Sequence, residues 1–231
     1  MVEKKCIAVI PARGGSKRIP GKNIVDFHGR PLLYWTIEAA RQSGLFDRIL
    51  VSTDDPAIAS AAERCGLEVP FLRDRCADDQ ATASSATIAA LAQVETILHE
   101  TYAIVVQLMP TCPLRKGNHI TQAYANFTRR RARFQISCTT FGPTNPWWAV
   151  KLDDLMQPSP LFPDALVSRS QDLPPLYCPT GAIWIAGTEA LKNAGTFYGP
   201  SHIYFPMPWT AALDIDEPAD LELARALFSS S

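Results

Sequence analysis

The chain has 231 residues, of which 47% are hydrophobic and 19% are charged, and its formal net charge is −1. This length fits a single domain with one sizeable hydrophobic core. A net charge near zero gives no overall attraction to nucleic acid or to anionic lipid, so we expect neither as a partner. An anionic ligand must therefore be held by local charge.

The sequence gives no sign of a membrane or secreted protein. No apolar stretch approaches the roughly 20 residues that span a bilayer, and residues 1–5 lead into an expected strand rather than a signal peptide. The six cysteines are scattered, with no CxxC pair and no histidine at zinc-ligand spacing. We therefore expect a cytoplasmic protein with reduced cysteines.

The first half of the chain alternates short apolar runs with helical patterns, which is typical of βαβ units around a parallel sheet. In chain order we expect strand 6–10, helix 32–41, strand 48–52, helix 56–65, strand 67–72, helix 84–100, strand 103–108, helix 118–131 and strand 134–140. The predicted fold is a three-layer α/β/α, Rossmann-like fold with a mostly parallel central sheet.

Residues 142–179 interrupt this pattern, because they hold eight prolines, two adjacent tryptophans and little periodicity. We interpret them as an excursion from a single domain that spans residues 1–231. After the excursion we expect strand 181–186, strand 203–205 and a C-terminal helix at 218–228.

The loop between the first strand and the first helix is dense in glycine and in cationic residues. A loop at the carboxyl end of a parallel strand lies where open α/β sheets bind ligands. Its glycines allow backbone N–H groups to approach a phosphate closely. Charge for a triphosphate would come from Arg13, Lys17, Arg18 and Lys22. We interpret the loop as a triphosphate site; the alternative is a basic surface loop.

Two better-known phosphate loops do not match. A Walker loop has four residues between its glycines and Ser or Thr after the lysine, whereas Gly15 and Gly21 enclose five residues and Asn23 follows Lys22. The dinucleotide fingerprint GxGxxG is absent as well. A P-loop ATPase and a nicotinamide enzyme are both disfavoured.

The string IAVIPARGGSKRIPGKN at residues 7–23 resembles the signature of the acylneuraminate cytidylyltransferase family, which includes the CMP-sialic acid synthetases and bacterial CMP-nonulosonate synthetases. The resemblance continues through 51–54, 110–115, 171–174 and 181–183 to 214–216. It implies a nucleotide-diphospho-sugar transferase-like fold and a homodimer with 142–179 as a dimerisation arm. It also implies that CTP and an acidic, sialic-acid-like sugar give CMP-sugar and pyrophosphate for surface glycans.

The resemblance implies which residues contact the nucleotide. The expected nucleotide-binding residues are Ala12, Arg13, Gly14, Ser16, Lys22, Asn23, Arg73, Ser84 and Ser85. Arg73, together with Ser84 or Ser85, matches the cytosine-reading positions of the family; the alternative for these residues is a surface salt bridge and a helix cap. Arg13, Lys22 and Asp216 are the expected catalytic residues, the first two as charge stabilisers.

Asp214 and Asp216 flank Ile215 just before the terminal helix. Extended geometry would place both carboxylates on one face, with Cα atoms roughly 6.5–7 Å apart, while Ile215 packs inward. Mg²⁺ binds one or two carboxylates together with phosphate oxygens. By resemblance, we expect this pair to hold the magnesium ion that meets the CTP phosphates; the alternative is that Asp216 caps the helix.

The acceptor side departs from the sialic acid pattern. The expected sugar-binding residues are Met109, Thr111, Arg169 and Thr180. Met109 stands where sialic acid enzymes usually carry glutamine, Ser170 where a second arginine is common, and Thr180 where asparagine is usual. With Trp147 and Trp148, these changes suggest a less polar acceptor; alternatively, the tryptophans pack the dimerisation arm.

Rival interpretations stay open. The nearest is another sugar nucleotidyltransferase of the same fold, such as a 3-deoxy-octulosonate cytidylyltransferase. A different class is a non-catalytic, nucleotide-binding regulatory protein. For the catalysed reaction, a metal-bound oxygen, Asp216 or water could take the acceptor's proton. The arginines at 129–131 end an expected amphipathic helix and are interpreted as a solvated face.

Overall fold

The computed structural model describes residues 5–74, 81–142 and 144–229. At its centre is a six-stranded sheet in the order β10-β6-β9-β5-β1-β4. The strands are β1 (Cys6–Pro11), β4 (Arg48–Ser52), β5 (Ile104–Gln107), β6 (Phe134–Thr139), β9 (Cys178–Gly187) and β10 (Ile203–Pro206). Pairing is parallel except along β9, which runs antiparallel to β5 and β6. The predicted mostly parallel sheet is confirmed.

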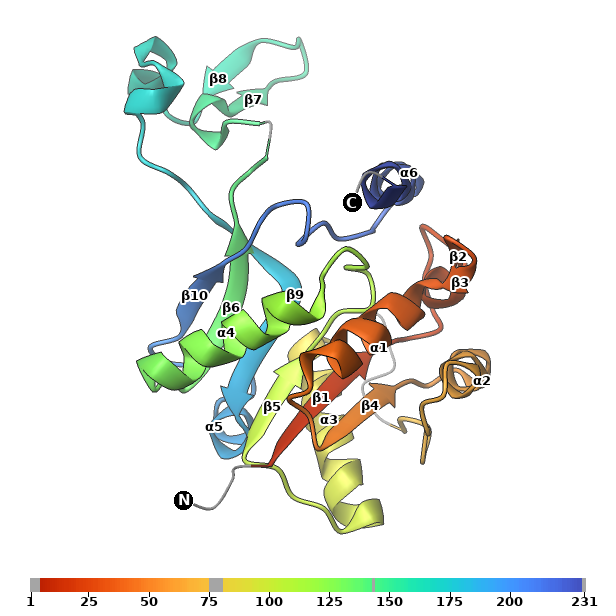
Figure 1. The fold of residues 1–231 in the computed structure, drawn as a ribbon. Coiled ribbons are helices and arrows are strands. Elements are labelled where there is room, and N and C mark those ends of the chain that lie inside the picture. The colour runs from red at the N-terminus through yellow and green to blue at the C-terminus, as the bar shows by residue number, and fades with distance from the viewer. Residues whose placement is uncertain (1–4, 75–80, 143, 230–231) are drawn as a thin grey trace.

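Helices cover both faces of the sheet (Figure 1). On one face lie α1 (Leu32–Ser43) and α4 (Gly117–Arg130), and on the other lie α3 (Ala83–Gln93) and α5 (Thr188–Ala194). Successive residues of β1 point to opposite faces of the sheet. Ala8 and Ile10 belong to the hydrophobic cluster on one face, and Ile7 and Val9 belong to the cluster on the other. The uninterrupted apolar strand therefore reflects burial on both faces, as the sequence predicts.

The prediction of a strand at residues 67–72 was wrong. After α2 (Pro56–Arg64), residues 67–72 form no strand, and β4 is the edge of the sheet. Pro70 lies in the middle of this run and has no N–H to donate to a ladder, which explains why the apolar pattern does not become a sixth parallel strand. The helix expected at 84–100 is α3 followed by a π-helical turn at Val94–Leu98.

The segment before the C-terminal helix α6 (Pro218–Ser229) is fixed by a small hydrophobic cluster. Ile215 is fully buried there and packs with Ile19 of the first loop and with Phe27 of the short hairpin β2 (Asp26–Phe27) and β3 (Arg30–Pro31). Burial of Ile215 places its two aspartate neighbours next to the loop after β1, as the alternation predicts.

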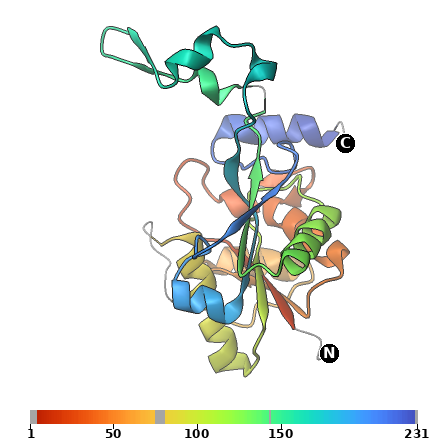
Figure 2. The same ribbon diagram turned by 90° about the vertical axis from the view of Figure 1, so that its left-hand side faces the viewer.

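The excursion stands apart from the sheet and its helices (Figures 1 and 2). It holds the hairpin β7 (Val150–Leu152) and β8 (Pro158–Pro160) and three short 3₁₀ helices at Pro146–Trp148, Pro163–Val167 and Ser170–Asp172. The indole of Trp147 donates to Pro174 O at 2.8 Å, and that of Trp148 donates to Ala165 O at 3.2 Å. The tryptophans therefore pack the arm, which is the alternative that the sequence left open.

In the described part of the chain, no helix has the length and apolarity that crossing a membrane requires. Cys6, Cys65, Cys112, Cys138 and Cys178 form no disulfide among the described residues, and Cys76 lies outside them.

A polar cluster ties β4 to the entry of β5 at the end of the sheet away from the first loop. Arg48 donates from Nε and Nη2 to the two carboxylate oxygens of Glu100, both at 2.7 Å, and Tyr102 bonds to the same carboxylate. The hydrogen bond from Arg48, followed by that from Tyr102, lowers the pKa of Glu100 to about 2. Glu100 therefore contributes stability above its ordinary pKa of 4.5, and the contribution is lost as the pH falls toward 2.

We predict that Glu100→Gln lowers the free energy of unfolding at pH 7, and that its difference from the wild type shrinks between pH 4.5 and the lowest pH at which both proteins fold. Urea denaturation across this range measures the difference. A difference that does not change with pH would show that the Glu100 charge does not stabilise the fold.

Candidate active site

The loop after β1 is tied to neighbouring segments by its backbone. The Gly14 N–H donates to Asp54 Oδ1 at 3.2 Å, and the Asn23 side chain donates to Arg13 O at 2.9 Å. A Cβ atom on Gly14 would lie 2.5 Å from an oxygen of Asp55, so only glycine fits this close approach. The loop is therefore a fixed structure, and its cationic side chains extend from a backbone of defined shape.

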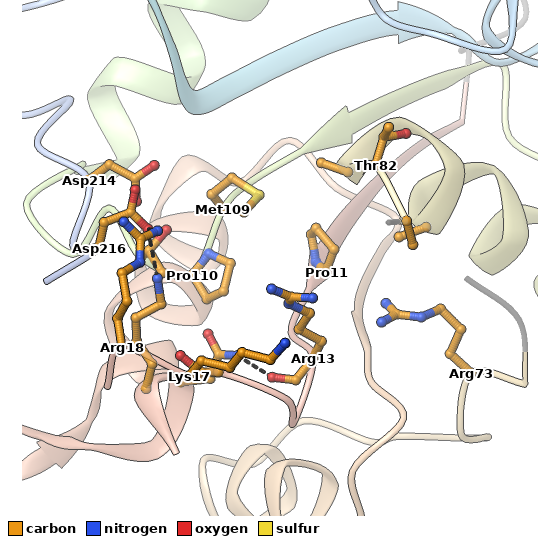
Figure 3. Close-up of a pocket in the computed structure, with 17 residues that line it drawn as sticks. Pro11, Arg13, Lys17, Arg18, Arg73, Thr82, Met109, Pro110, Asp214 and Asp216 are labelled. Atoms are coloured by element: carbon orange, nitrogen blue, oxygen red, sulfur yellow. Dashed lines mark hydrogen bonds and ion pairs between the residues drawn. The ribbon is translucent and has the colours of Figure 1, made fainter. Parts of the chain in front are cut away.

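A cavity of about 530 Å³ opens at the carboxyl end of β1, a volume that suits a small-molecule ligand. Figure 3 shows Arg13 and Lys17 along one side, the aspartates with Arg18 at one end, and Arg73 at the other. Predicted site residues that line it are Arg13, Ser16, Lys22, Asn23, Arg73, Met109, Thr111, Asp214 and Asp216. The folded chain thus brings together residues from both ends of the sequence.

Lys22 joins the first loop to the aspartate segment. Its ammonium donates to Ile215 O at 2.8 Å and to Asp216 Oδ1 at 3.0 Å, across 193 and 194 residues of sequence. Arg18 Nη2 lies 2.8 Å from the same Asp216 oxygen. Although burial opposes ionisation, these hydrogen bonds and charges outweigh it and lower the pKa of Asp216. Asp216 is therefore an ionised, paired carboxylate.

Asp214 is in the opposite situation. Its Oδ1 atom is buried and has no hydrogen-bond partner among the residues that the structure describes. Burial, with the charge of Asp216 adding to it, raises the pKa of Asp214, and the neighbouring Thr111 hydroxyl and Lys22 ammonium only partly oppose this. A buried carboxylate oxygen without a donor is costly unless a cation or a ligand completes it.

The donor set fits a metal ion that a ligand brings with it. In residues 5–74, 81–142 and 144–229, no group of three or more His, Cys, Asp or Glu side chains is placed to hold a metal. Two carboxylates with a free oxygen on Asp214 are, however, what Mg²⁺ uses when phosphate oxygens and water fill its remaining positions. The site can accept magnesium together with a phosphate ligand.

Arg73 forms the other end of the cavity. Its side chain is 2% exposed, and its Nη1 donates to Ser52 O at 3.0 Å while Nη2 lies 3.6 Å from Asp54 Oδ1. Because Asp54 also accepts from Gly14, one carboxylate fixes both the first loop and Arg73. The sequence interpretation did not assign Asp54 a role, although its place directly after a strand of the parallel sheet is a signal for a site residue.

The two serines expected to read cytosine lie outside the cavity. Ser84 is buried and its hydroxyl accepts from the Phe197 N–H at 3.2 Å, on the side of α3 that faces the core. Ser85 donates to Thr82 O in the first turn of the helix. The start of α3 instead turns other residues toward the cavity. Thr82, which is the N-cap residue of this helix, lines the cavity together with Ala81 and Ala83.

Two expected sugar contacts also lie elsewhere. Arg169 is in the arm, mostly exposed, and pairs with Asp172 at 2.7 Å. The Thr180 hydroxyl lies 2.8 Å from the Ser137 hydroxyl within the sheet. Ala12 is completely buried and contributes its backbone, with its N–H donating to Ser52 O at 2.9 Å. Of the expected acceptor residues, Met109 and Thr111 line the cavity of their own chain.

Comparison with known proteins gives the family. The family model described as cytidylyltransferase matches residues 7–145. The pseudaminic acid cytidylyltransferase of Campylobacter jejuni subsp. jejuni serotype O:23/36 (strain 81-176) is 36% identical over 225 residues, covering 97% of this chain and 96% of that protein. The CMP-N,N'-diacetyllegionaminic acid synthase of Legionella pneumophila subsp. pneumophila (strain Philadelphia 1) is 33% identical over 230 residues, with 96% of each chain covered.

Among solved structures, the CTP complex of CMP:2-keto-3-deoxy-manno-octonic acid synthetase superposes with a TM-score of 0.71 at 19% identity, covering 98% of this chain and 99% of the other. This likeness confirms the fold class. The chain belongs to the cytidylyltransferase family, and it is a nucleotidyltransferase enzyme. The family resemblance carried by residues 7–23 is confirmed.

We predict that Asp214→Asn stabilises the ligand-free protein. A carboxyl group whose pKa is raised in the folded state loses stability as it ionises at rising pH, and asparagine removes that charge. Thermal denaturation at pH 7 should show a higher Tm for the variant than for the wild type. The gain should disappear near pH 4. A lower Tm of the variant than of the wild type at pH 7 would show that the buried Asp214 charge does not destabilise the ligand-free protein.

Proposed function

We propose that the protein transfers CMP from CTP to an acidic nonulosonic sugar and releases pyrophosphate, as a step in surface glycan synthesis. The observation that carries this proposal is the arrangement of one cavity, in which a basic, glycine-rich loop faces a carboxylate pair of which one oxygen is buried and unpartnered. The named relatives, which act on pseudaminic and diacetyllegionaminic acids, support this class of acceptor.

The cavity suggests how CTP lies. Its triphosphate would follow the first loop, where Arg13 and Lys17 lie along one side of the space (Figure 3). Its cytosine would reach the end formed by Arg73 and the residues around Thr82, where guanidinium and backbone groups offer donors and acceptors for a base edge. This order leaves the α-phosphorus near Met109 and the aspartates.

We propose Mg²⁺ as the cofactor, with Asp214 and Asp216 as its protein ligands. When bound, the ion would neutralise charge on the phosphate oxygens and make the α-phosphorus more electrophilic. Lys22 holds Asp216 in place and adds positive charge to the same region, while Arg13 faces the phosphates. The fixed cations stabilise charge that develops as pyrophosphate leaves.

In this mechanism the anomeric hydroxyl of the acceptor attacks the α-phosphorus in line, its proton passes to water, and pyrophosphate departs on the opposite side. The lowered pKa of Asp216 disfavours it as the general base, because a carboxylate paired with Arg18 and Lys22 holds a proton weakly. Asp216 is better suited to holding charge in position than to accepting the proton of the hydroxyl.

The acceptor wall agrees with a sugar that is less polar than N-acetylneuraminate. Met109 presents a thioether beside Pro110, where a glutamine would offer hydrogen bonds. An apolar wall accepts a sugar carbon that lacks a hydroxyl and leaves the hydroxyl of a hydroxylated carbon without a hydrogen-bond partner.

Because the reaction consumes CTP, we propose that the protein acts in the cytoplasm.

The first experiment measures pyrophosphate release with Mg²⁺, using each nucleoside triphosphate against a panel of nonulosonic and octulosonic acids. We predict release with CTP and a deoxygenated, N-acylated nonulosonic acid. Lys22→Met, which removes the charge and keeps an unbranched side chain one atom shorter, should lower kcat by about 10²–10³-fold, the cost of losing one preorganised charge stabiliser.

Three other outcomes would change the proposal. Preference for an octulosonic acid would make the protein an octulosonate cytidylyltransferase. Phosphate as product would indicate an ATPase-like reaction. CTP binding without release for any acid in the panel would favour a non-catalytic regulatory protein.

We also propose that the arm makes the protein a homodimer. Several large apolar side chains of the arm face solvent, including Leu155 at 78% and Val167 at 90% exposure. Monomeric proteins seldom expose so much apolar surface in one place, and a second copy of the chain is the partner that the family resemblance implies. Arg169 would then be available to the partner's site rather than to its own.

We predict that Leu155→Glu combined with Val167→Glu converts the dimer to a monomer, because a charge buried at an apolar interface opposes association. Light scattering at several protein concentrations measures the mass. Ile97→Glu, at an exposed apolar residue outside the arm, is the matched control and should stay dimeric. A monomeric wild type, or a dimer that survives both arm substitutions, would contradict this use of the arm.

A further inference from the structure

Arg115 is a buried cation that the proposed reaction does not use. It follows the turn that begins at Met109 after β5, and it is 1% exposed. Burial lowers its pKa to about 10, with Cys112 and Asp214 opposing the shift only in part. The guanidinium is therefore charged at neutral pH in a place where a charge is costly, which calls for a physical reason.

The hydrogen bonds of Arg115 converge on the Met109 carbonyl. Its Nη1 donates to Met109 O at 3.2 Å and to Ala182 O of β9 at 2.6 Å. Its Nη2 donates to the Thr36 hydroxyl of α1 at 2.6 Å, and that hydroxyl donates in turn to Met109 O at 3.3 Å. One side chain thus connects a helix, a central strand and the turn with charge-assisted hydrogen bonds, which a neutral residue could not replace.

The opposite side of the same turn forms the catalytic cavity. Met109 and Thr111 line it, and Thr111 O accepts from the Ile215 N–H at 2.9 Å, between the two aspartates. On β9, a Cβ atom added to Gly181 would lie 2.8 Å from Met109 Cγ and 3.6 Å from Asp214 Oδ2. The turn, the strand and the carboxylate segment are therefore in direct contact, and a displaced turn would displace the others.

We infer that Arg115 is a positioning residue, which fixes the Met109–Thr111 turn from behind and thereby sets both the acceptor wall and the carboxylate segment at Asp214. This inference rests on the proposed function. Arg115 does not line the catalytic cavity, so its effect passes through the Met109 carbonyl. Arg73, at the other end of the cavity, is held by Ser52 and Asp54, so the base end of the nucleotide should depend least on Arg115.

The test compares Arg115→Lys with the wild type. Lysine keeps the charge, but its single ammonium cannot replace the fork that reaches three acceptors. Thr36→Val, which removes the hydroxyl between Arg115 and Met109 O, is a second variant in case the first folds poorly. Arg48→Lys is the matched control, because it weakens a comparable arginine cluster at the other end of the sheet.

Two kinds of readout separate positioning from stability. Steady-state kinetics, normalised to the concentration of folded enzyme, should show two changes in Arg115→Lys. The KM for the acceptor and the Mg²⁺ concentration for half-activation should each rise by about ten-fold or more, as expected for loss of an outer supporting contact. Calorimetry should show that CTP binds without Mg²⁺ as in the wild type, whereas the gain in CTP affinity on adding Mg²⁺ is reduced. Thr36→Val should change in the same direction by less, and Arg48→Lys should lower only Tm.

Unchanged acceptor KM, Mg²⁺ half-activation and Mg²⁺-dependent CTP affinity in folded Arg115→Lys and Thr36→Val would overturn the inference and leave Arg115 with a purely structural part. The same change in Arg48→Lys would also overturn it. A wild type that releases no pyrophosphate with any acceptor would instead count against the proposed function, which the wild-type assay decides separately.

Discussion

The hydrogen bonds of Lys22 hold the site together. This side chain comes from the loop after the first strand and reaches a carbonyl and a carboxylate just before the last helix, at 2.8 and 3.0 Å. Without this connection, the basic loop and the acidic segment would be two separate surface features. With it, they form the two sides of one cavity, and the buried Ile215 between the aspartates prevents the segment from rotating.

The same connection makes the two aspartates unequal. Asp216 is paired with Lys22 and Arg18, so its charge is already compensated. Asp214 is buried with one oxygen unpartnered, and the Thr111 hydroxyl and the Lys22 ammonium only partly compensate its charge. Two neighbouring carboxylates in different environments can serve different purposes: Asp216 holds the loop in place, and we propose that Asp214 meets a cation that arrives with the nucleotide. A buried carboxylate of this kind lowers the stability of the ligand-free protein, and such a loss of stability is typical of a functional site.

Sequence reasoning predicted the alternating architecture, the basic loop and the carboxylate pair, because each depends on local pattern: apolar runs, glycine with cations, and two acids around one apolar residue. It was wrong about residues 67–72, a mostly apolar run that Pro70 interrupts and that pairs with no strand. It also misplaced Ser84 and Ser85, because helix register at the start of α3 decides which residue faces the cavity.

The sequence pattern could not predict contacts between segments that are distant in the sequence. Nothing local in the run Pro110–Arg115 indicates that Arg115 turns inward to Thr36 and Ala182, since those partners are 79 and 67 residues away. Likewise, the sequence assigns Arg169 to the acceptor, but the fold places it in the arm, and it does not line the cavity of its own chain. Such contacts depend on how the elements pack in three dimensions.

We propose that Asp214 keeps a free carboxylate oxygen for a cation bound together with CTP. Calorimetric titration of CTP with and without Mg²⁺, in the wild type and in Asp214→Asn, distinguishes this role from a purely structural one. Mg²⁺ should strengthen CTP binding to the wild type, and most of this gain should be lost in the variant, while binding without Mg²⁺ is retained or improved. An equal gain from Mg²⁺ in both proteins would rule this role out.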